Sequence, residues 1–90
     1  MSSQRTPTDE PNRSRAARGR YALWSHAVDQ FSGNEKMARR EMRLDIRSRF
    51  VDLLTDLRHF AAAKGIDFDA ADVMAQVHFR GERSGEEGRV

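Results

Sequence analysis

The sequence predicts an all-α protein of three helices, arranged with the long second helix at the centre, and with disordered termini. Two observations carry this prediction. Apolar residues recur three or four positions apart over most of the chain, which is the period of a helix. Glycine follows two such segments, at Gly33 and Gly65, where a residue in the left-handed conformation commonly ends a helix. We see no segment that alternates apolar and polar residues as a strand does.

Residues 1–15 contain no apolar residue after Met1, so we expect a disordered basic arm. A single helical domain is expected over residues 16–80, and a flexible polar tail over residues 81–90. The first predicted helix covers residues 16–32. Gly33 and Asn34 then reverse the chain, so the second helix should run antiparallel to the first. The apolar stripe of the first helix consists of Ala17, Tyr21, Trp24, Val28 and Phe31.

The central helix is predicted from Asn34, a good N-cap residue, to Lys64, just before Gly65. It carries a second, thinner apolar line away from the main stripe, so two neighbours are expected to contact it. The thin line is Met37, Leu44 and Val51. The main stripe is Ile46, Phe50, Leu53, Leu54, Leu57, Phe60 and Ala61.

The third predicted helix starts after Asp67, its expected N-cap, and ends at about Arg80. Its apolar stripe should fold back onto residues 50–60 and cover them. That stripe consists of Ala70, Val73, Met74 and Val77.

Composition limits the classes of protein to which this chain can belong. Ninety residues hold one small domain, which as a monomer would be marginally stable. The absence of cysteine and of a signal-peptide pattern favours a cytoplasmic protein. No apolar run approaches the roughly 20 residues of a membrane span, so no membrane association is expected. No cofactor-binding motif is present, and no cofactor is expected.

Charged side chains form two groups that deserve separate interpretation. The sharper group is a basic stripe that could follow a phosphate backbone or simply be solvated. It consists of Lys36, Arg39, Arg40, Arg43 and Arg47. The weaker group is a set of metal-ligand candidates, Asp52, Asp56 and His59, for which local pairs such as Arg49–Asp52 are the simpler interpretation. No catalytic residue is predicted.

Two resemblances concern the second half of the chain. The run from Asp52 to Phe60 (D-L-L-T-D-L-R-H-F), followed by G-I-D-F-D at residues 65–69 and His78-Phe79, resembles small uncharacterised all-helical proteins of bacterial mobile elements. The helix pair is also similar to the closing part of MazG-type nucleotide pyrophosphohydrolases. Those enzymes hold Mg²⁺ with an E-x-x-E pair, which this sequence lacks.

The leading functional prediction is a small non-enzymatic interaction or accessory protein that binds a protein partner or itself. A homodimer is expected, because the helices carry more apolar surface than their neighbours can cover. Trp24, Met37, Leu44 and Val51 are the expected contact residues. One alternative is a sequence-nonspecific nucleic-acid binder that uses the basic stripe. A second alternative is a degenerate MazG-like hydrolase.

Overall fold

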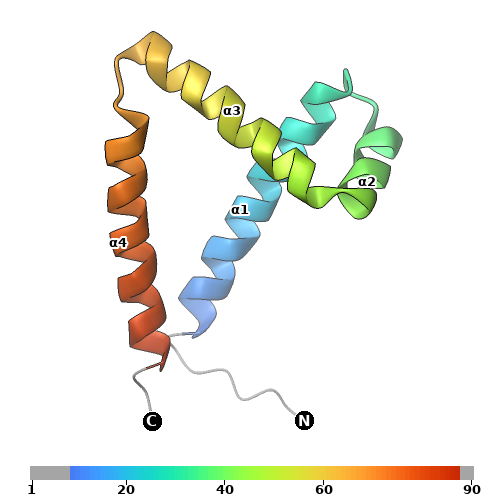
Figure 1. Cartoon of the computed structure of the whole chain (residues 1–90). Coiled ribbons are helices and arrows are strands. Elements are labelled where there is room, and N and C mark those ends of the chain that lie inside the picture. The colour runs from blue at the N-terminus through green and yellow to red at the C-terminus, as the bar shows by residue number, and fades with distance from the viewer. Residues whose placement is uncertain (1–8, 88–90) are drawn as a thin grey trace, which may run out of the picture.

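The computed structural model describes residues 9–87, which form four helices (Figure 1). They are α1 (Asp9–Gln30), α2 (Glu35–Leu44), α3 (Ile46–Lys64) and α4 (Phe68–Glu87). No strand occurs within residues 9–87, so the prediction of an all-α protein is confirmed. The expectations for residues 1–8 and 88–90 lie outside the described residues.

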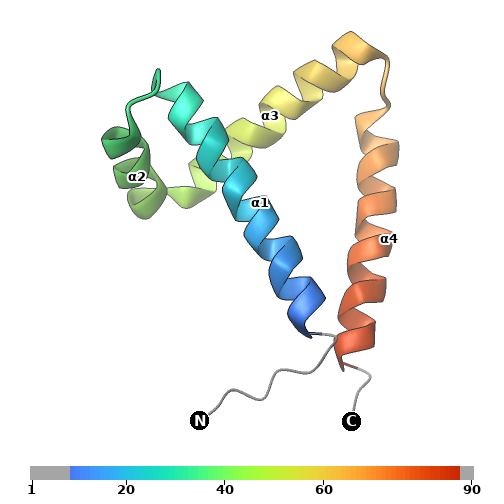
Figure 2. The same ribbon diagram turned by 180° about the vertical axis from the view of Figure 1, so that it is seen from behind.

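Three of the helices, α1, α3 and α4, form the sides of a triangle (Figures 1 and 2). Helix α3 crosses α1, α4 turns back from the end of α3, and the first turns of α1 lie near the last turns of α4. The molecule measures 45 × 38 × 17 Å and has a radius of gyration of 16.1 Å. A compact domain of this length has a radius of gyration of roughly 12 Å. Since one helix with its side chains is about 10–12 Å across, the protein is a thin plate.

The prediction of one continuous helix from Asn34 to Lys64 is wrong, because the helix breaks at Asp45. This residue adopts φ −155° and ψ 69°, ends α2 and caps α3. Its carboxylate accepts hydrogen bonds from the Ser48 backbone N–H at 3.1 Å and from the Ser48 hydroxyl at 2.6 Å. Aspartate competes for backbone donors in this way and therefore favours helix starts over helix interiors. The protein therefore has four helices, and the predicted long central helix is divided into α2 and α3.

The predicted turns are largely confirmed. The Asn34 side chain caps α2 by accepting from Met37 N at 3.0 Å, and the Asp67 side chain accepts from Ala70 N at 3.0 Å. Gly65 is left-handed, with φ 72°, as expected after α3. At the end of α1, however, Ser32 also has a positive φ, 56°, beside Gly33 at 84°.

The outer helices are longer than predicted. Helix α1 begins at Asp9 instead of Ala16, and α4 runs to Glu87 instead of Arg80. The two extensions contact one another at the corner of the triangle. There the Asn12 side chain donates to the Glu82 carbonyl at 3.1 Å, and Arg15 pairs with the Glu82 carboxylate at 3.3 Å. These contacts join residues far apart in the sequence, so local composition could not predict them.

The prediction that the last helix covers the main stripe is also wrong. Val77 on α4 is 53% exposed and Phe60 on α3 is 56% exposed. Helix α4 diverges from α3 after the turn (Figure 1), and at this elbow Arg58 pairs with Asp69 at 3.0 Å and lies 4.3 Å over the Phe68 ring. The buried apolar side chains of the described range are instead Leu23, Ala27, Ala38 and Ala61.

Candidate functional site

A polar network joins α1 to α3 where the two helices cross. His26 Nε2 lies 2.7 Å from Asp56 Oδ2, and the Gln30 amide donates to Asp52 Oδ2 at 2.8 Å. Arg49 donates to Gln30 Oε1 at 2.8 Å and pairs with Asp52 at 3.3 Å, which confirms the predicted Arg49–Asp52 pair. Helix α1 therefore contacts α3 through polar side chains beside the apolar stripe of α3, and most of that stripe stays exposed.

The metal-ligand candidates have other roles in this arrangement. Asp52 and Asp56 bind side chains of α1, as described above, and His59 is exposed and hydrogen-bonds to neither. Within the described residues, no group of three or more His, Cys, Asp or Glu side chains could hold a metal ion. The carboxylates that suggested a metal site thus stabilise the crossing of α1 and α3.

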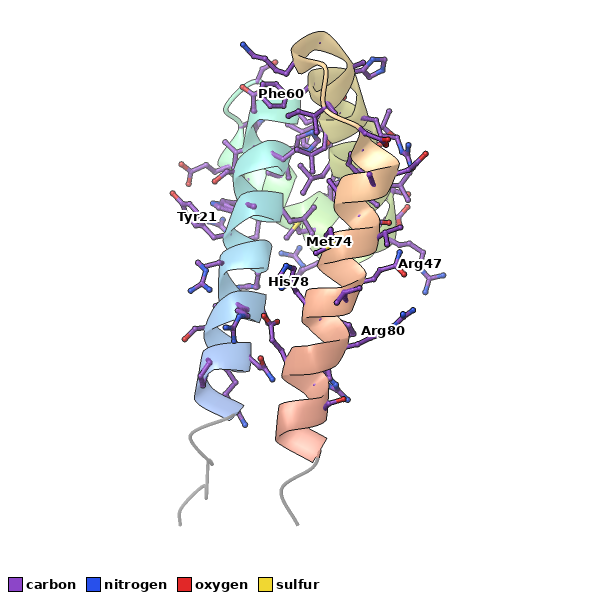
Figure 3. All side chains as sticks on the ribbon, turned by 90° about the vertical axis from the view of Figure 1, so that its left-hand side faces the viewer. Tyr21, Arg47, Phe60, Met74, His78 and Arg80 are labelled. Atoms are coloured by element: carbon purple, nitrogen blue, oxygen red, sulfur yellow. The ribbon has the colours of Figure 1, made fainter. Side chains whose placement is uncertain are left out.

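Large apolar side chains stay exposed along both α3 and α4. We call this set the α3–α4 surface, and it consists of Phe50, Leu54, Leu57, Phe60, Val73, Met74 and Val77, all of them exposed. In Figure 3, Met74 and His78 point from α4 toward the side on which α1 lies. Since large exposed apolar patches mark interaction sites in soluble proteins, these side chains are the candidates for one.

The predicted self-association residues do not form one surface. Met37 and Leu44 are exposed on α2, but Val51 lies beyond the break at Asp45, on α3. Trp24 is half-buried and lines a groove between α1 and α2. The sevenfold spacing of Met37, Leu44 and Val51 places them on one line only if the helix is continuous, and it is not.

The groove between α1 and α2 has a volume of about 710 Å³. Only Arg39 and Arg43 of the predicted basic stripe line it; Lys36, Arg40 and Arg47 do not. Arg39 lies 5.7 Å over the Trp24 ring. The full lining is Ala17, Arg20, Tyr21, Trp24, Glu35, Arg39, Met42, Arg43 and Ile46.

Sequence reasoning missed the contribution of α1 to this groove. The spacing assigns Tyr21 to an apolar stripe, but it does not place Tyr21 or Arg20 beside α2. The signal was the spacing of Arg13, Ala17, Arg20 and Trp24, which places basic and apolar residues on one helical face.

When the chain was compared with known protein families, curated proteins and solved structures, no match was found. None of the helices within residues 9–87 combines the length and the apolar character that crossing a membrane requires. The inferences below therefore depend on the surfaces of this chain itself.

Proposed function

We propose that this protein acts by binding and not by catalysis, and that its first partner is a second copy of itself. The observation that carries the proposal is the exposed α3–α4 surface. A helical protein of this size normally buries such residues against another of its own helices, but α4 is directed away from α3. A second copy supplies the missing layer.

The exposed area is consistent with an extensive contact. The accessible surface is 7125 Å². A compact monomer of 10.3 kDa exposes roughly 5,400 Å², so the excess is about 1,700 Å² per chain. Interfaces of permanent homodimers bury about 2,000–5,000 Å² in total, which is the scale that two such chains would bury together.

The distribution of charge favours a two-fold arrangement. Residues 34–49 carry a net charge of +3, whereas residues 50–79 carry −3. In an antiparallel pair, the basic residues of α2 that lie outside the α1–α2 groove would lie near the acidic region at residues 50–79 of the other copy. Opposite charges at the rim would fix the orientation of the two copies, while the apolar centre supplies most of the binding energy.

Sedimentation equilibrium at micromolar concentration tests the proposal. The wild-type chain should sediment as a dimer, and Leu57→Glu should produce a monomer with unchanged helical circular dichroism. Leu57 is 42% exposed in the single chain, so a charge there does not disrupt a core. Thr55→Glu is the matched control, because Thr55 is exposed on another face of α3. A helical wild-type monomer, or a Leu57→Glu variant that remains dimeric, contradicts the proposal.

The MazG-like alternative has less support. The acidic pairs that its metal would need are absent from the sequence, and Asp52 and Asp56 bind α1. Release of pyrophosphate from nucleoside triphosphates in the presence of Mg²⁺ would restore this alternative. The resemblance to proteins of mobile elements stays a prediction.

A further inference from the structure

The groove between α1 and α2 combines positive charge with two aromatic rings, the exposed Tyr21 and the half-buried Trp24. We propose that it binds single-stranded nucleic acid, with phosphates on its arginines and a base stacked on Tyr21. This proposal concerns a different surface from the α3–α4 surface and does not depend on self-association. Figure 3 shows Tyr21 on the side of α1 away from α4, whereas Met74 lies on the side of α4 toward α1.

Among the described residues, the groove carries more positive than negative charge. Arg20, Arg39 and Arg43 line it together with a single acid, Glu35. None of the ion pairs that the structure describes involves these three arginines. Three guanidinium groups without carboxylate partners create a local positive potential, and guanidinium is well suited to bind phosphate in two-point geometry.

The aromatic residues distinguish a nucleic acid from other anions. Tyr21 is 70% exposed, and neither α2 nor α4 covers its ring. One turn further along α1, the Trp24 ring makes a cation–π contact with Arg39, which lies 5.7 Å from the centre of the ring. Each base of a single strand has a free face that can stack on such a ring, which an acidic peptide lacks. In a duplex the bases are already stacked on one another, so a double helix cannot use this platform.

A strand is favoured over a free nucleotide because the basic residues continue past the groove. Arg13 lies four positions before Ala17, on the groove-facing side of α1, and is exposed. A mononucleotide would fill only the centre of the groove, whereas a longer strand would also contact Arg13 beyond the end of the groove.

Trp24 is the only tryptophan of the chain and therefore reports directly on this groove. A titration of the full chain with a dT 20-mer at low salt should quench Trp24 fluorescence in a saturable manner. Three phosphate contacts predict that log K falls with log salt with a slope of roughly −2. The same 20-mer as a duplex, thymidine monophosphate and polyglutamate, each at equal charge concentration, should bind at least tenfold more weakly.

Two variants and a matched control locate the site. Tyr21→Ala should weaken dT binding roughly 5- to 150-fold, and Tyr21→Phe, which keeps the stacking ring, should restore it. Arg43→Gln should reduce the salt slope by about 0.7, whereas Arg80→Gln, the same charge change on the far side of α4, should leave it unchanged. Circular dichroism checks that each variant is folded.

Four results would overturn the proposal: no quenching by the dT 20-mer at low salt, equal binding of the duplex or of polyglutamate, equal binding of thymidine monophosphate, or full affinity in folded Tyr21→Ala. Equal binding of polyglutamate would identify an acidic protein segment as the occupant. Equal binding of thymidine monophosphate would identify a nucleotide site.

Discussion

Ala27→Leu is the substitution that most directly tests the observed packing. Ala27 and Ala38 are both 0% exposed, and they lie on α1 and α2, which pack side by side. No large side chain in the described range is fully buried. The helices therefore pack closely at alanine residues, and this packing replaces a core of large side chains. A leucine side chain at position 27 would have no space.

The expected loss of stability follows from overpacking. Extra methylene groups in a filled site typically cost about 1–3 kcal/mol through displaced rotamers and backbone shifts. For a domain of this size, each kcal/mol lowers the melting temperature by roughly 4–8 °C, so a decrease of about 5–20 °C is expected. The same change at Ala22, which is exposed on the same helix, should alter stability by less than about 0.5 kcal/mol.

Thermal unfolding followed by circular dichroism measures both variants, at one protein concentration so that self-association contributes equally. If Ala27→Leu melts within 2 °C of Ala22→Leu, position 27 is not a packed contact. The packing of α1 against α2 would then be looser than the burial of Ala27 and Ala38 indicates, and the groove between the two helices would not keep its shape.

Two further predictions concern the helix ends. Ser32→Gly should raise the free energy of unfolding by about 1 kcal/mol in urea titrations, because Ser32 has φ 56° and glycine adopts that conformation without strain; Gly33→Ala should lower it. The hydrogen bonds from the Ser48 hydroxyl and backbone, with smaller effects of Arg49 and Arg47, hold the pKa of Asp45 below its ordinary value of 3.8. The stabilisation by this carboxylate is thus present above pH 3.8 and lost as the pH falls through the lowered pKa. Asp45→Asn should be less stable than wild type at pH 7, and the difference should vanish in strong acid. A difference that persists or grows in acid would contradict this assignment.

The sequence by itself determined the helical class and several local signals. Asn34 and Asp67 cap helices as predicted, and Gly65 ends one, because capping depends on residues within one turn. Even the break at Asp45 has a local cause, the bond to Ser48, although the apolar periodicity on either side of it predicted a continuous helix. Periodicity records which residues share a face and does not record where the helix axis bends.

Only the tertiary structure decided which apolar faces are covered. The stripes of α3 and α4 were each identified from the sequence, but their spacing cannot specify the angle between the two helices. That angle depends on the elbow at Arg58 and Asp69 and on the contact of Asn12 with Glu82, which joins residues at opposite ends of the chain. The groove likewise required Arg20 and Tyr21 of α1 to lie beside Arg43 of α2. Its charges are readable in the sequence, but their proximity arises from the packing of two helices.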